Sequence, residues 1–127
     1  MLAVDTNVLV RLIARDDATQ VRAADEFVSK GAWISHLVLA ETMWVLDSVY
    51  GLSREKMSTA VEMLLNHQDL TLQDSDVVAE ALANFRRRTA VDFSDCLVLG
   101  IARKAGHIPL ATFDRDFAKM DGVQRLR

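Results

Sequence analysis

Short apolar runs alternate along this chain with longer stretches in which apolar residues recur at helical spacing, and this alternation constrains the fold most strongly. Strands are expected at residues 2–4, 32–34, 70–72, 108–112 and 123–126. Helices are expected at residues 6–13, 18–31, 35–51, 53–65, 77–85 and 92–106, with a turn or short helix over 114–120. Strands that alternate with helices form a parallel sheet covered on both faces. The predicted fold class is therefore α/β, a three-layer sandwich with a central parallel sheet of four to five strands.

One domain over residues 1–127 is expected, because this length suits a single core and no stretch rich in Pro, Gly or Ser marks a boundary. The longest uncharged apolar stretches are well short of the ~18 residues that a membrane span needs. Asp5 interrupts the first apolar run and no basic segment precedes it, unlike a secretory signal. We therefore expect a cytoplasmic protein with no membrane partner.

Cysteine and charge exclude further classes of protein. A single cysteine, Cys96, cannot form an internal disulfide, and three scattered histidines give no zinc-ligand spacing. The net charge of −3 is the reverse of that of a protein that holds nucleic acid by a basic surface. Any contact with nucleic acid must therefore be local.

Two acidic residues follow expected strands, at the sheet edge where parallel α/β folds bind their ligands. Asp5 closes the first strand, and Asp114 comes shortly after the fourth. Turn formation is the alternative explanation for both. If the strands are parallel, these two carboxylates lie at the same edge of the sheet.

Two more acids lie on apolar stripes of expected helices. Glu41 has Leu37 one turn before it and Trp44 about one turn after it, and a structural ion pair with an arginine is the alternative role. Asp95 has Asp92 one turn before it, and for this pair the alternative is helix capping and compensation of the helix dipole.

Carboxylates in one crevice need a positive charge, because each pair at ~4–6 Å repels by roughly 3–4 kcal/mol at an effective dielectric near 20. No Lys or His adjoins Asp5, Glu41 or Asp95 in the sequence. Ligand sets made only of oxygen suit Mg²⁺ or Mn²⁺, which also bind substrate phosphate oxygens. One or two such ions would activate water for attack on a phosphodiester, so the acids predict phosphoryl chemistry.

Four motifs, in this order, resemble those of the PIN-domain ribonucleases, and most closely the VapC-type toxins of bacterial and archaeal toxin-antitoxin pairs. They are Val-Asp-Thr-Asn at 4–7, Leu-Ala-Glu at 39–41 after Ser35, Asp-Phe-Ser-Asp at 92–95, and Leu-Ala-Thr-Phe-Asp-Arg-Asp-Phe at 110–117. The resemblance spans essentially the whole chain. It implies a PIN-like, Rossmann-like fold and a magnesium-dependent endoribonuclease that cleaves RNA.

The resemblance also implies roles for individual residues. The catalytic and metal-binding acidic quartet would be Asp5, Glu41, Asp95 and Asp114, with Mg²⁺ or Mn²⁺ as the cofactor. Accessory positions would be Thr6, Asn7, Asp92, Thr112 and Asp116, and either Asp114 or Asp116 can be the fourth acid. The partners implied are RNA, a VapB-like antitoxin and a second copy of the chain in a homodimer.

Basic and aromatic residues have less specific interpretations. Three arginines, Arg86, Arg87 and Arg88, either complement the dipole at a helix end or contact the RNA backbone. Arg11 and Arg15 are candidates to contact phosphate or to hold the acids in place. The residues expected in the core, and not as stacking platforms for bases, include Trp33, Trp44, Phe85, Phe93 and Cys96.

Two rival interpretations belong to other functional classes. A receiver-type phosphoacceptor domain has similar length and acidic strand ends, but it needs a Lys at a late strand end, and residues 110–112 contain none. A catalytically inactive PIN-like binding module is disfavoured by the complete set of acids. The RNA target and the number of metal ions are not fixed by the sequence, because carboxylates recognise phosphate geometry and not bases.

Overall fold

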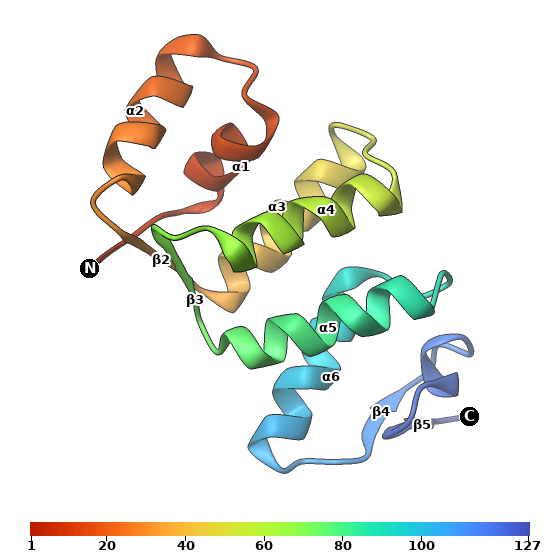
Figure 1. Ribbon diagram of the computed structural model, residues 1–127. Coiled ribbons are helices and arrows are strands. Elements are labelled where there is room, and N and C mark those ends of the chain that lie inside the picture. Colours follow the sequence, from red (N-terminus) through yellow and green to blue (C-terminus); the bar gives the residue numbers. More distant parts are fainter. The chain divides into compact units, whose positions relative to one another are not determined.

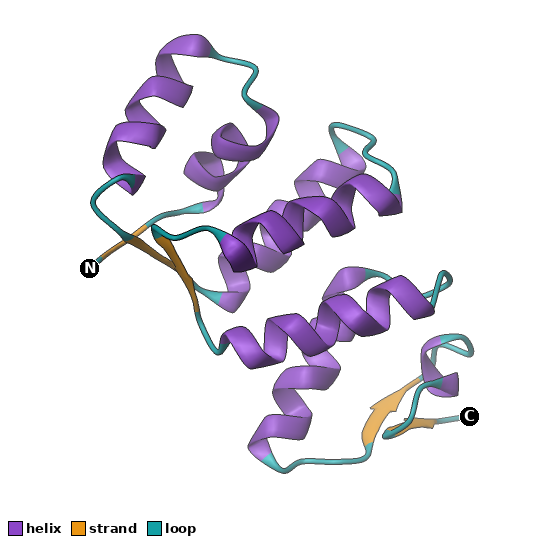
Figure 2. Cartoon of the chain, viewed as in Figure 1, coloured by secondary structure: helices purple, strands orange, loops and turns teal.

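A computed structural model describes residues 1–127 (Figure 1). The chain divides into two compact units, Met1–Ser75 and Asp76–Arg127. Helices make up most of both units, and the strands are short (Figure 2).

The first unit is built on a three-stranded parallel sheet. Its elements are β1 (Leu2–Ala3), α1 (Thr6–Ala14), α2 (Ala18–Val28), β2 (Ala32–Ile34), α3 (His36–Ser48), α4 (Arg54–Asn66) and β3 (Leu70–Leu72). The strand order is β1-β2-β3, with Leu2 paired with Ala32 and Ala32 with Leu70. All three strands therefore end at the same edge, and α1 and α3 begin there.

Side-chain caps fix where the helices of this unit begin. Ser35 accepts a hydrogen bond from the backbone N–H of Val38 at 3.1 Å, and Ser53 caps α4 in the same way. Asp5, the residue before α1, caps this first helix. The reason is that Thr6 already has helical geometry, which leaves Asp5 as the last extended residue.

The core of the first unit lies between its helices and its sheet. Fully buried side chains come from every layer, namely Leu9, Ile34, Leu39, Leu46, Val61 and Leu64. Helix α1 packs against both α2 and α3, and α4 packs against β3. This packing holds the start of α1 rigidly against the middle of the unit.

The second unit consists of α5 (Ser75–Arg87), α6 (Phe93–Ala105), β4 (Leu110–Thr112), the 3₁₀ turn η1 (Phe117–Lys119) and β5 (Val123–Arg125). The strands β4 and β5 pair in parallel, with Leu110 opposite Val123. Gly100 lets α6 approach α5 closely, because a Cβ there would lie 3.1 Å from Val77 Cγ1. Phe85 and Phe93 stack edge to face with ring centroids 5.8 Å apart.

The predicted α/β class and the parallel strands are confirmed, and each expected helix is present within about a turn at either end. The main sheet has three strands, fewer than the four to five expected, because β4 and β5 pair with each other in a second sheet. That residues 1–127 form one domain stays a prediction. No helix is both long and apolar enough to cross a membrane.

Burial confirms most of the expected core but not all of it. Cys96, Phe85 and Phe93 are buried. The expectation for Trp44 is wrong, since this side chain on α3 is 65% exposed. Trp33 was also expected in the core, but 37% of its surface is exposed. Helix α3 is apolar around most of its circumference, so helical spacing did not distinguish its covered face from its exposed one.

Candidate active site

Asp5 lies between the end of β1 and the start of α1. Its Oδ1 accepts a hydrogen bond from the backbone N–H of Val8 at 3.2 Å, so the carboxylate faces the N-terminal end of the α1 dipole. The side chain is exposed, and its other oxygen has no hydrogen-bond partner in the first unit. Asp5 thus serves as a helix cap and still offers one oxygen to a ligand.

Glu41 lies on the exposed face of α3 and is joined to the same strand end. The hydroxyl of Thr6 donates a hydrogen bond to Glu41 Oε2 at 2.8 Å. Within the first unit Glu41 forms no ion pair with an arginine, and Thr6 is its hydrogen-bond partner. Since Thr6 follows Asp5 directly, this bond places two predicted acids near each other, and it gives Thr6 the role of holding the second acid.

Three carboxyl groups of the second unit interact around the start of α6. Burial, together with the nearby Asp92 and the charge of Asp114, raises the pKa of Asp95 to about 6. Asp92 caps the helix, because its Oδ1 accepts from the backbone N–H of Asp95 at 2.9 Å. Asp92 therefore caps the helix, as the alternative explanation proposed, and Asp92 and Asp95 also lie in a group of interacting carboxyl groups.

The final motif forms a tight turn around Asp114. The backbone N–H of Asp114 donates to the Thr112 hydroxyl at 3.0 Å, and Asp114 Oδ1 accepts from the N–H of Phe117 at 2.8 Å. Asp116 instead lies 3.5 Å from the ammonium group of Lys119. Of the two candidates for the fourth acid, Asp114 is the one whose charge acts on Asp95.

The predicted basic residues differ in how they are used. Arg86, Arg87 and Arg88 are exposed around the end of α5, where Arg87 donates to Asn84 at 2.8 Å. Arg15 pairs with Asp25 at 2.8 Å, so it holds neither Asp5 nor Glu41.

A divalent cation fits the chemistry of these donors. Asp5 and Glu41 supply carboxylate oxygens in the first unit, and Asp95 and Asp114 supply them in the second. Burial raises the pKa of Asp95 most, and the neighbouring Asp92 and Asp114 raise it further, with a negative charge that a hard cation would offset. Within either unit, no three Asp, Glu, His or Cys side chains are placed to hold a metal ion by themselves.

A cavity of about 430 Å³ adjoins Asp5 between α1 and α2. Its lining comprises Asp5, Asn7, Val8, Arg11, Gln20, Ala23, Ala24 and Phe27. Asp5 and Asn7 were expected at the site from the sequence, whereas the α2 residues that line the cavity were not. The signal available was the two adjacent alanines, whose small side chains leave space beside Phe27.

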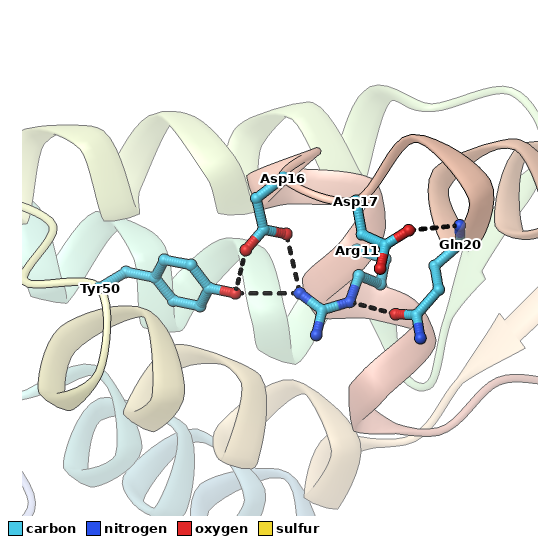
Figure 3. A network of polar contacts seen from close by, with 5 residues as sticks. All are labelled: Arg11, Asp16, Asp17, Gln20 and Tyr50. Carbon is cyan, nitrogen blue, oxygen red and sulfur yellow. Dashed lines mark hydrogen bonds and ion pairs between the residues drawn. The ribbon is translucent and has the colours of Figure 1, made fainter.

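A polar network fixes one end of this cavity (Figure 3). Arg11 Nη1 donates to Asp16 at 2.8 Å and to the Tyr50 hydroxyl at 3.0 Å, and that hydroxyl donates to Asp16 at 2.9 Å. Arg11 Nε also donates to the side-chain oxygen of Gln20. The sequence had made Arg11 a candidate to hold the acids, but it holds the cavity wall.

A family model described as the PIN domain matches residues 2–123, a segment that contains every predicted site residue. Curated proteins give no match, and solved structures give none either.

Proposed function

This chain belongs to the PIN domain family, whose members are generally metal-dependent nucleases, and from that premise we propose that it is a metal-dependent endoribonuclease. The observation that carries the proposal is the crowding of Asp92 and Asp114 around a partly buried Asp95. Asp92 and Asp114 each accept a hydrogen bond from a backbone N–H, but the negative charge that these three carboxyl groups bring together is unfavourable without a cation. Such an arrangement suits a site that works with a bound cation.

Four carboxylates would hold the metal, namely Asp5, Glu41, Asp95 and Asp114. A bound Mg²⁺ or Mn²⁺ would supply the Lewis acidity that activates water and stabilises the leaving oxygen of a phosphodiester. The chain's own residues do the positioning. Thr6 fixes the rotamer of Glu41, Asp92 orders the first turn of α6, and Thr112 shapes the turn that holds Asp114.

RNA is the proposed substrate. The exposed guanidinium groups of Arg86, Arg87 and Arg88 are candidates for contacts to its backbone phosphates. They supply a local cluster of positive charge on a chain whose net charge is −3.

The first prediction is RNA cleavage that requires Mg²⁺ or Mn²⁺ and stops in EDTA. We expect Asp5→Asn and Asp95→Asn each to lower kcat by about a hundredfold or more, because each removes a negative ligand from the cation that stabilises the transition state. The measurement is single-turnover cleavage of a labelled, largely single-stranded RNA by purified protein.

The matched control is Asp47→Asn, an exposed acid on α3, the helix that carries Glu41. It makes the same chemical change outside the site and should cleave at the wild-type rate. Cleavage that persists in metal-free buffer, or an active Asp5→Asn protein, would contradict the proposal. A folded wild-type protein that cleaves no RNA would instead favour an inactive PIN-like binding module.

Within this proposal, the chain acts in the cytoplasm as the toxin of a VapBC-type toxin-antitoxin pair and forms a homodimer. The basis is the resemblance of its four motifs to those of VapC-type toxins, together with its place in the PIN domain family. A ribonuclease of this kind needs an external inhibitor, and an arginine from a VapB-like antitoxin suits a site made of carboxylates.

A further inference from the structure

We propose that the cavity between α1 and α2 is a nucleobase pocket, which receives the base of a nucleotide whose phosphate is bound through the cation that Asp5 would help to hold. The inference rests on the proposed ribonuclease function, because Asp5 belongs both to the acidic quartet and to the cavity wall. It adds a recognition site for the substrate, whereas the carboxylates recognise only phosphate.

The size and lining of the cavity suit one planar ring. Its volume of about 430 Å³ is in the range of small-molecule sites. Val8 on α1 and Ala23 and Ala24 on α2 give it apolar walls. The side chain of Phe27 is 37% exposed and offers a face on which a base can stack.

The two ends of the cavity differ in chemistry. The bond from Arg11 to Gln20 fixes one end, about one helical turn from Asn7 along α1. Asp5 caps the beginning of α1 and therefore lies at the other end. A nucleotide whose phosphate is bound through the cation at Asp5 would direct its base along the cavity towards Arg11 and Gln20.

Arg11 and Gln20 present two hydrogen-bond donors. An arginine cannot accept a hydrogen bond, so the Gln20 oxygen faces Arg11 Nε and the Gln20 amide nitrogen faces away. Arg11 Nη1 is used by Asp16 and Tyr50, while Nη2 has no partner in the network (Figure 3). Figure 3 shows Nη2 and the Gln20 amide nitrogen on the same side of this contact.

Two donors on one side of this contact favour a base with two acceptors on one edge. Guanine offers O6 and N7 side by side, whereas the corresponding edge of adenine pairs an acceptor with a donor. Because Asp16 and Tyr50 hold the guanidinium in place, little side-chain entropy is lost on binding. We therefore expect the pocket to bind guanine more tightly than adenine.

The direct test uses nucleosides without metal, so that it does not depend on catalysis. Guanosine, adenosine, cytidine and uridine are titrated into the wild-type protein and followed by NMR of backbone amides. We expect guanosine to shift the signals of Val8, Ala23 and Phe27 and to bind about tenfold more tightly than adenosine. Shifts elsewhere only, or equal binding of all four, would overturn the proposal.

Two variants test the lining, each with a matched control. Ala23→Leu fills the cavity and should abolish guanosine binding, whereas Ala79→Leu makes the same change at an exposed position of α5. Gln20→Glu keeps the acceptor for Arg11 but removes the amide donors, so guanosine binding should weaken about tenfold. Gln68→Glu adds the same charge away from the cavity and should bind guanosine like the wild type.

Cleavage assays separate this proposal from the ribonuclease proposal. If the wild type cleaves RNA, Ala23→Leu should lose any preference for guanosine beside the cleaved bond while still requiring the metal. Cleavage with unchanged preference in Ala23→Leu would overturn the pocket and leave the ribonuclease intact. If Ala23→Leu weakens only the binding of an antitoxin, the cavity belongs to a protein partner and the pocket is again overturned.

Discussion

Asp95 lies where burial already disfavours a charge and two further carboxyl groups oppose it. Its pKa of about 6 is above the value of about 3.9 for an unfolded chain, so the folded protein holds this proton more tightly. Between about pH 4 and 6 the unfolded chain loses the proton first, and the free energy of unfolding falls as the pH rises. Metal binding would reverse this effect at neutral pH.

We predict that Asp95→Asn raises the metal-free melting temperature at pH 7 and has a smaller effect at pH 4. The amide cannot ionise, so the variant lacks the loss of stability between these two pH values. The measurement is thermal unfolding in EDTA at both pH values, with Asp47→Asn as the control. A melting temperature several degrees below that of the wild type at pH 7 would mean that Asp95 acts mainly as a charge at the start of α6.

Residue identity and order were enough to propose the acids, but not to predict their hydrogen bonds. That Thr6 would bind Glu41 depends on α1 and α3 packing side by side, a contact between residues far apart in sequence. That the charge of Asp114 acts on Asp95 depends on the turn in which Asp114 donates its backbone N–H to the Thr112 hydroxyl. Such orientations are set by tertiary packing and not by local pattern.

At the scale of elements, the loop between α1 and α2 is tied to the end of α3 by the network of Arg11, Asp16 and Tyr50. The hydrogen bond from Tyr50 is the main cause that holds the pKa of Asp16 below its usual value, and Arg11 contributes further. Asp16 therefore stabilises the fold above about pH 4, and this contribution is lost as the pH falls through its lowered pKa.

We predict that Tyr50→Phe destabilises the protein by about 1 kcal/mol at pH 7, because it removes one acceptor and one donor from a partly exposed network. The pKa of Asp16 should rise towards its usual value, and the destabilisation should shrink below about pH 4. Urea unfolding at pH 7 and pH 3 and an NMR titration of the Asp16 carboxyl group measure the two effects. An unchanged Asp16 pKa would show that the hydroxyl does not bind it in solution.

Elements with a local signal were predicted well. Ser35 and Ser53 cap the two helices that were expected to begin at residues 35 and 53, and Gly106 ends α6 with a φ of 83°, a conformation that favours glycine. The prediction for Trp44 was wrong because both faces of α3 are apolar, and only the packing of the unit decides which face is buried. The cavity beside Asp5 was missed because it is made by two helices together, and neither helix shows it alone.

At the scale of the whole molecule, the acids divide between two compact units, with Asp5 and Glu41 in one and Asp95 and Asp114 in the other. The order of the motifs along the chain predicted the family, because that order does not depend on which strands pair with one another. The number of strands in the main sheet was not predictable, because β4 and β5 are each three residues long and carry no signal for their partner.

The last prediction concerns control of the whole protein in a cell. An active ribonuclease without an inhibitor would degrade RNA, so expression of this chain alone should arrest growth. Co-expression with the small reading frame expected beside its gene should relieve the arrest, because a basic side chain of the antitoxin would neutralise the carboxylates that otherwise hold the metal. The measurements are growth curves and the integrity of total RNA.

Asp5→Asn should be harmless when expressed alone, and Asp47→Asn should be as toxic as the wild type, since only the first removes a ligand of the proposed site. Comparing the two variants at equal protein levels separates toxicity due to catalysis from toxicity due to overproduction. If the wild-type chain accumulates in its native host without a partner and leaves growth and RNA unchanged, the toxin role is wrong. The nuclease role would then be judged by cleavage in vitro alone, since a PIN domain can cut RNA without serving as a toxin.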